Sequence, residues 1–199
     1  MKLDKDVTVI DDFIDEEYQE QIKNILIGNQ DFLWDDRELQ FDWYFISDVT
    51  DAFSDRQQKR CALTHEYAGL DWEEDEDDEL NNLFVPMLSE VCKKMDFDNL
   101  KILQGRSFLQ FPLNLKDKTV DTPHVDLQQE HLVALYYVCD SDGDTIIYNE
   151  RHEPADKVYT VKQRVTPKQG RMVLFDGSLY HTAEQPEHNV RCVVNYNLG

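Results

Sequence analysis

The sequence is short of positive charge and has no long apolar run. Lys and Arg together number 20 against 41 Asp and Glu, so the formal net charge is −21. A protein this acidic repels nucleic-acid phosphates and anionic lipid headgroups, which makes nucleic acid an unfavourable partner. The longest apolar runs, such as residues 132–138, fall far short of the roughly 20 residues of a membrane-spanning helix, and the first residues do not read as a signal peptide. We therefore expect a cytoplasmic protein that does not span a membrane.

Cysteine is also scarce and is not arranged for a framework. The four cysteines lie far apart and form no C-x-x-C pair. Zinc knuckles and disulfide-rich domains depend on closely spaced cysteines, so both are disfavoured here. We expect reduced thiols, as is usual in the cytoplasm.

Apolar and aromatic residues, by contrast, are present in the amounts of a folded protein. Hydrophobic residues make up 41% and aromatic residues 11% of the 199 residues, which argues against disorder and suggests one domain. The acidity is uneven, because residues 1–100 carry a net charge of −19 and residues 101–199 only −2. The densest acidic run, residues 71–79, is expected to be a solvated loop leading into a helix N-terminus, where negative charge is favoured.

Hydrophobic periodicity separates two regions of different structure. Apolar spacing predicts helices over 18–26 and 80–95, the second kinked or restarted by Pro86, with strands over 7–10 and 41–46 and a further helix over 55–68. The second half instead holds short β-branched and aromatic runs between turn residues. Eight strands are expected there, over 102–111, 121–125, 132–139, 144–149, 157–165, 171–175, 179–184 and 190–198.

This pattern predicts an α+β fold. Eight short strands in succession are typical of a jelly roll, whose inner face can hold a metal or a small ligand, as in cupins. No linker or low-complexity tract separates the halves. We therefore expect a single domain over 1–199, in which residues 1–100 form a helix-rich acidic support and residues 101–199 form a double-stranded β-helix, a cupin-like barrel, flanked by the N-terminal helices.

The most informative local pattern is His124-Val-Asp126. In an extended chain, residues two apart project from the same face, so both side chains could hold one ion. The pair alone is a weak signal, since such spacings arise by chance. A second histidine, His181, follows the strand and turn of residues 171–180. Two histidines and one carboxylate form the facial triad that binds Fe(II) and leaves positions open for substrates and oxygen.

Arg191 complements such a metal centre. A bidentate 2-oxo acid bound to the metal would direct its distal carboxylate into the barrel, where a buried anion needs a fixed cation. The guanidinium of Arg191 can bind that carboxylate through two hydrogen bonds. In an extended strand Asn195 and Asn197 share the face of Arg191, so we interpret both amides as pocket lining.

Several of these motifs together resemble the Fe(II)- and 2-oxoglutarate-dependent dioxygenases, and within them the prolyl-4-hydroxylase-like oxygenases of short bacterial and phage type. The resemblance is strongest over about residues 100–199. It rests on His124-Val-Asp126, Leu-Tyr-Tyr-Val at 135–138, Gly143-Asp-Thr145, Pro167-Lys-Gln-Gly170, Val173-Leu-Phe175, His181 and Arg191.

The resemblance implies a role for each matching residue. His124, Asp126 and His181 correspond to the iron ligands, Arg191 to the residue that holds the distal carboxylate of 2-oxoglutarate, and Tyr137 to a tyrosine hydrogen-bonded to it. Relatives often carry a second tyrosine before the His-x-Asp motif, whereas this chain has Gln110-Phe111-Pro112. Phe111 cannot supply that hydroxyl, so Gln110 is the candidate replacement. No catalytic residue is expected beyond the metal centre.

The function implied is hydroxylation of a substrate C–H bond with Fe(II), 2-oxoglutarate and O2, releasing succinate and CO2. The substrate could be a prolyl residue of a peptide or protein, or a small molecule. An alternative is a non-catalytic, cupin-like module that binds a metal or a small acid, and a zinc hydrolase with the same ligands is a weaker third. The combination of Arg191 with a complete triad favours the oxygenase, because neither alternative needs both.

Overall fold

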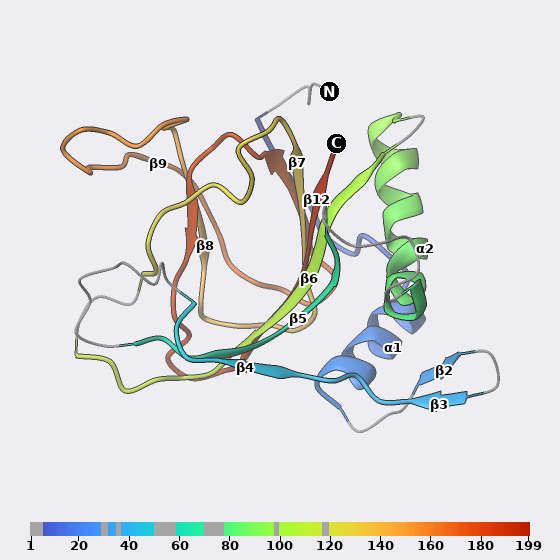
Figure 1. The fold of residues 1–199 in the computed structure, drawn as a ribbon. Helices are drawn as coiled ribbons and strands as arrows, with labels where there is room; N and C mark the ends of the chain where they lie inside the picture. Colours follow the sequence, from blue (N-terminus) through green and yellow to red (C-terminus); the bar gives the residue numbers. More distant parts are fainter. Residues whose placement is uncertain are drawn as a thin grey trace.

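The computed structural model describes residues 6–28, 32–34, 37–49, 59–69, 78–97, 100–116 and 120–199. Within them, two helices lie against one side of a large antiparallel sheet, and a smaller sheet lies on its other side (Figure 1). The elements are β1 (Val7–Ile10), α1 (Glu16–Leu26), β2 (Phe32–Trp34), β3 (Arg37–Leu39), β4 (Tyr44–Ile46), β5 (Ala62–Ala68), α2 (Asp78–Met95), β6 (Ile102–Gln110), β7 (Leu132–Tyr137), β8 (Thr145–Tyr148), β9 (Val161–Val165), β10 (Met172–Asp176), β11 (His181–Ala183) and β12 (Arg191–Leu198).

Helix α1 begins at a well-defined cap. The side chain of Asp15 accepts a hydrogen bond from the backbone N–H of Tyr18, and Glu16 and Glu17 place negative charge in the first turn. Both features stabilise a helix N-terminus. Helix α2 runs as one element through Pro86 and begins at Asp78, inside the acidic run. The rest of that run, residues 71–77, lies outside the described residues.

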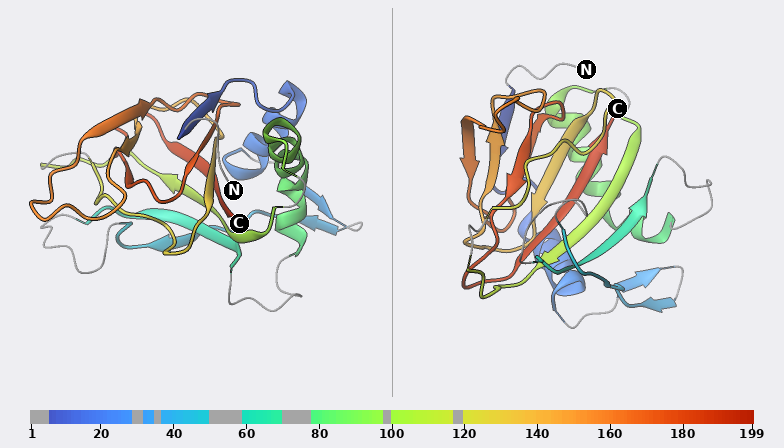
Figure 2. Two further views of the ribbon diagram at one scale, coloured as in Figure 1. Left: turned by 90° about the horizontal axis from the view of Figure 1, so that it is seen from above. Right: turned by 60° about the vertical axis from the view of Figure 1, so that its left-hand side comes forward.

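The described strands form two main sheets and a small hairpin. The larger has seven strands in the order β1-β10-β7-β12-β6-β5-β4, and the smaller has three in the order β11-β8-β9; a separate hairpin pairs β2 with β3. All pairings are antiparallel. Figure 2 shows that strands from both ends of the chain lie side by side in the larger sheet. This agrees with the expected α+β arrangement of helices and antiparallel sheets.

Alternation along the central strands divides the interior into two parts. In β12, Cys192, Val194 and Tyr196 join a core that includes α1 and α2, whereas Val193 joins a second cluster on the opposite face. Strands β7 and β10 divide in the same way. Successive side chains of a strand point to opposite faces, so one face of the sheet packs on helices while the other is left to line a cavity.

Two sequence predictions are wrong in detail. The segment 62–68, expected to be helical, is strand β5, paired with β4 and β6; residues 55–58 lie outside the described part. A short apolar run does not show reliably whether its period is that of a helix or of a strand. In this segment, pairing with the neighbouring strands determines that it is a strand. The segment 121–125 forms no strand; isolated bridges at Val120 and His124, one on each side of Pro123, join it to residues 181–184. Proline has no N–H to continue a ladder.

Among the described residues no helix is long and apolar enough to cross a membrane. The cytoplasmic location stays a prediction. The four cysteines are free, two of them buried and two partly buried.

The two-sided packing makes the helix-side core sensitive to truncation. Leu174, in β10, is fully buried in that core. We expect Leu174→Ala to lower the free energy of unfolding by about 2–5 kcal/mol, because it removes apolar contact and leaves a cavity. Val158 is 61% exposed, so the control Val158→Ala should change the free energy of unfolding by less than about 0.5 kcal/mol. Urea unfolding followed by circular dichroism measures both; equal effects would contradict this assignment of the core.

Candidate metal centre

A pair of backbone hydrogen bonds brings two histidines together. His181 begins β11, and His124 lies in the irregular segment before β7. The two form an isolated antiparallel bridge, in which His124 N donates to His181 O at 3.0 Å and His181 N donates to His124 O at 2.9 Å. Their ring centroids lie 4.7 Å apart. The bridge therefore fixes the spacing of the two imidazoles.

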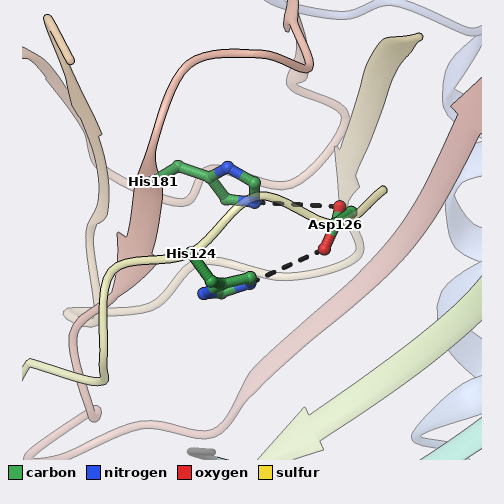
Figure 3. A group of neighbouring side chains, drawn as sticks. All are labelled: His124, Asp126 and His181. Atoms are coloured by element: carbon green, nitrogen blue, oxygen red, sulfur yellow. Dashed lines mark ion pairs between the residues drawn. The ribbon is translucent and has the colours of Figure 1, made fainter. Parts of the chain in front are cut away.

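Asp126 lies beside both imidazoles (Figure 3). Its Oδ1 is 3.6 Å from His124 Nε2, and its Oδ2 is 3.7 Å from His181 Nε2. One ligand atom from each of the three residues lies within 4.8 Å of the other two. The structure thus gathers the three sequence-predicted ligands into a group that can hold a metal ion, with the donor set that suits Fe(II).

The backbone also sets the tautomer of each imidazole. His124 Nδ1 lies 3.0 Å from the carbonyl oxygen of Thr122, and His181 Nδ1 lies 3.2 Å from that of Leu179. A carbonyl oxygen only accepts hydrogen bonds, so Nδ1 of each ring carries the proton. In the neutral ring Nε2 then has a free lone pair, and in both residues it is Nε2 that faces Asp126. Such backbone contacts orient metal-binding histidines.

The charges of the group also suit a metal. Burial lowers the pKa of His181 to about 4, which keeps this imidazole neutral at physiological pH. Burial raises the pKa of Asp126, but the nearby charge of Arg106 and the hydrogen bond with His124 outweigh it and hold that pKa well below its usual value. Burial lowers the pKa of His124, and the attraction of its protonated ring to Asp126 outweighs this, so the net shift is upward. An ionised carboxylate and neutral imidazoles are the forms that bind metal, so the shifts of Asp126 and His181 favour metal binding, whereas that of His124 favours the protonated ring and opposes it.

Two residues of the larger sheet hold the Asp126 carboxylate. Arg106 Nη2, from β6, donates to Oδ1, and Asn195 Nδ2, from β12, donates to Oδ2 at 3.2 Å. Arg106 and Asn195 are direct cross-strand partners. Sequence reasoning did not identify Arg106. The sequence did contain one signal: Arg106 lies four residues before Gln110 in a predicted strand, so both side chains project from the same face.

Arg191 lies at the other end of the same cavity. Its guanidinium is buried and donates three hydrogen bonds, from Nε to Gly143 O at 3.1 Å, from Nη1 to Gln110 Oε1 at 2.9 Å, and from Nη2 to Thr145 Oγ1 at 2.8 Å. Within the described part of the chain, no carboxylate lies within ion-pair distance of it. A buried cation with only neutral partners is suited to receive an anion.

The turn before β8 makes room for this arginine. A Cβ on Gly143 would lie 3.2 Å from Arg191 Cδ and 2.6 Å from the carbonyl oxygen of Glu184. Thr145 receives a second hydrogen bond at Oγ1, from the hydroxyl of Tyr137 at 2.7 Å. Tyr137 therefore lies behind Thr145, with its ring 5.8 Å from the guanidinium carbon of Arg191.

A buried polar chain continues from Arg191 through Gln110. Gln110 Nε2 donates to Asp121 Oδ2 at 3.2 Å, and Asp121 Oδ1 is 3.4 Å from Arg60 Nε. The side chains of Arg60 and Asp121 are only 1% and 7% exposed. The ion pair fixes the Gln110 amide so that its oxygen faces Arg191. Neither Arg60 nor Asp121 was identified from the sequence, because nothing local relates two residues so far apart.

These groups surround a cavity of about 360 Å³. Of the predicted cosubstrate residues, Arg191, Gln110 and Asn195 line it, whereas Tyr137 and Asn197 do not. Asn197 is fully buried and donates to Gln104 Oε1 at 3.1 Å. The remaining lining includes Arg106, Thr145 and Asp121 and a set of apolar side chains, Val49, Phe108, Val133, Leu135, Phe175 and Val193.

The comparisons with known proteins agree with this fold. No family model and no curated protein matches the sequence. Solved structures match over nearly the whole chain, and their class is that of the 2-oxoglutarate- and Fe(II)-dependent oxygenases, including prolyl hydroxylases. The identities are low, so this likeness shows the fold.

Three of these structures illustrate the range of enzymes that share the fold. An oxidoreductase of the 2OG-Fe(II) oxygenase family from Burkholderia pseudomallei is 10% identical, with a TM-score of 0.66, covering 98% of this chain and 85% of its own. A prolyl-4-hydroxylase from Pseudomonas putida is 11% identical, with a TM-score of 0.57 and coverages of 98% and 92%. The carbocyclase SnoK from nogalamycin biosynthesis, an alpha-ketoglutarate-dependent non-heme enzyme, is 14% identical, with a TM-score of 0.61 and coverages of 98% and 80%.

Removing one ligand of the three should abolish tight metal binding. We expect His181→Ala and Asp126→Ala to lower Mn(II) affinity by at least tenfold, because each removes one of three coordinating groups. His188 is exposed and pairs with Asp142, so His188→Ala is the matched control and should bind as wild type does. Isothermal titration calorimetry measures the affinities. Unchanged binding by His181→Ala would show that the metal binds elsewhere.

Proposed function

We propose that the protein is an Fe(II)- and 2-oxoglutarate-dependent dioxygenase that hydroxylates a substrate C–H bond and releases succinate and CO2. The observation that carries this proposal is the presence, in one cavity, of a two-histidine, one-carboxylate group and a buried arginine with only neutral hydrogen-bond partners. The fold shared with oxygenases of this class supports it.

We also propose that the two sheets form a double-stranded β-helix and that residues 1–199 act as one domain. In support, the smaller sheet faces the larger one across the cavity, with Ile147, Val165 and Val173 packing in the same cluster. The helix-side core supports the domain assignment, because it joins residues of α1 and α2 to strands from the second half of the chain.

The metal group, Arg191, Gln110 and the apolar lining each have a proposed part in the reaction. His124, Asp126 and His181 would hold the iron, which when bound supplies the oxidative chemistry with O2 and 2-oxoglutarate. Arg191 would bind the distal carboxylate of 2-oxoglutarate, and Gln110 would orient the guanidinium. The apolar lining excludes water, which strengthens the interactions of the buried charges.

The roles of three further residues follow from their positions. Asn195 holds Asp126 Oδ2 from the cavity wall, so it would position the metal ligand and border the cosubstrate. Tyr137 would act on the cosubstrate indirectly, through its hydrogen bond to Thr145. Asn197 would also act indirectly, as a further polar residue on the β12 face that carries Arg191 and Asn195.

The substrate would be a prolyl residue or a small molecule. Similar structures include a prolyl-4-hydroxylase and a carbocyclase, so the same fold accommodates both kinds of substrate. The cavity of about 360 Å³ lies near the lower end of the usual range for ligand sites, and the cosubstrate would occupy part of it. Only a small molecule, or a small group of a larger substrate, can therefore enter.

Turnover of 2-oxoglutarate tests the proposed function. We expect wild type with Fe(II), O2 and ascorbate as the reductant to convert 2-oxoglutarate to succinate slowly even without a substrate, and Asp126→Ala to lose this activity. Arg151, exposed and paired with Asp6 and Asp176, gives the control variant Arg151→Gln, which should keep it. Succinate formation and O2 uptake are the measurements. Metal-dependent binding of 2-oxoglutarate with no succinate formed would instead favour the non-catalytic binding module.

Arg191 should control the affinity for the cosubstrate. Hydrogen bonds to charged groups are worth about 1.5–3 kcal/mol each, and about 1.4 kcal/mol is a factor of ten, so Arg191→Gln should weaken 2-oxoglutarate binding by at least tenfold. Gln110→Ala should weaken it by roughly a few-fold, because the guanidinium loses one of three orienting contacts. Calorimetry with Mn(II) in place of Fe(II) measures both. An unchanged affinity in Arg191→Gln would rule out this anion site.

A further inference from the structure

Arg106 is a second cation within the cavity. It lies on β6 with its side chain on the cavity face, beside the ring of Phe108, whose centroid is 5.1 Å from the guanidinium carbon. One nitrogen, Nη2, donates to Asp126. Another, Nε, is buried and has no hydrogen-bond partner among the described residues. The guanidinium therefore has donor capacity next to the metal ligands that the protein itself does not use.

Its cross-strand partner Asn195 also has a side-chain atom without a hydrogen-bond partner among the described residues. The amide nitrogen of Asn195 donates to Asp126, while its Oδ1 is buried and lacks a partner within the described part of the chain. Arg106 and Asn195 thus offer one unused donor and one unused acceptor from directly opposed strand positions. Buried polar atoms are almost always paired in folded proteins, so an unpaired donor and acceptor side by side call for a ligand.

The charges in the cavity point to the nature of that ligand. Asp121 is paired with Arg60, and Arg191 is assigned to the distal carboxylate of 2-oxoglutarate. The two positive charges of a bound metal would be offset by Asp126 and the other carboxylate of the cosubstrate. Among the described residues that line the cavity, this would leave one positive charge in excess once metal and cosubstrate are bound, because Asp126, the ion-pair partner of Arg106, would also serve the metal.

We propose that Arg106 and Asn195 form the substrate subsite and that the substrate is a small carboxylic acid carrying an adjacent N–H, as a free amino acid does. The planar guanidinium of Arg106 would receive the carboxylate, and Asn195 Oδ1 would accept from the N–H group. The cosubstrate and the substrate would share the cavity of about 360 Å³, which limits the substrate to a small acid. This inference rests on the proposed function and specifies the class of its substrate.

The test compares acids with their neutral counterparts. Protein is saturated with Mn(II) and the unreactive amide analogue of 2-oxoglutarate, and loading is verified by thermal stabilisation. Each of the common L-amino acids is then titrated as the free acid and as its carboxamide, with calorimetry as readout. We expect at least one free acid to bind wild type at least tenfold more tightly than its amide, and to bind less tightly when its amino group is removed.

Variants assign the preference to Arg106. Arg106→Gln should lose the tenfold preference for the acid over the amide, Arg106→Lys should keep part of it, and the control Arg151→Gln should keep all of it. Because Arg106 also contacts Asp126, Mn(II) affinity is measured separately for each variant. Asn195→Ala should reduce the difference between the amino acid and its deaminated form.

Several outcomes would overturn the proposal. Equal binding of acids and amides by wild type, or binding of neither, would show that no anionic substrate uses this subsite. An Arg106→Gln variant that keeps the acid preference and only loses Mn(II) affinity would show that Arg106 positions Asp126 and does not bind substrate. Failure of wild type to load with Mn(II) and the analogue would instead contradict the proposed function itself.

Discussion

The burial of the Asp126 carboxylate is the constraint on which the site depends. Its side chain is 1% exposed, and a buried anion is costly unless cations and hydrogen-bond donors surround it. Here the donors are Arg106 on β6 and Asn195 on β12. His124, in the segment before β7, and His181, on β11, lie beside the carboxylate with their Nε2 atoms 3.6 and 3.7 Å from its oxygens. The carboxylate therefore connects the larger sheet to the edge of the smaller one.

The alternation of the central strands lets this polar site exist beside a stable core. Polar groups such as Arg191 and Asn195 on one face of β12 contribute little to stability by themselves, whereas Cys192, Val194 and Tyr196 on the other face pack against the helices. The helices thus stabilise a sheet whose opposite face is free to carry chemistry. Helices on the cavity side would fill the space that the ligands need.

The site residues that could be predicted from the sequence are those placed relative to one another by a few residues of chain. His-x-Asp spacing, a strand and turn before His181, and the face shared by Arg191 and Asn195 each follow from chain geometry over a few residues. Thr145, Asp121 and Arg106 could not be assigned roles in this way, because they depend on the register between strands far apart in sequence. The same limit explains β5, where pairing with β6 overrides a pattern that is ambiguous by itself.

The charge of the molecule and the charge of its cavity act over different distances. Most of the net charge of −21 belongs to residues 1–100, and exposed charges are screened beyond about 8 Å at physiological ionic strength. The guanidinium groups of Arg106, which is partly exposed, and of Arg191, which is buried, act within the cavity, where screening is weak. An acidic polymer would be repelled along its whole length, whereas a small acid meets the acidic surface only on approach. If the proposed substrate subsite is correct, this combination would favour small anions over acidic polymers.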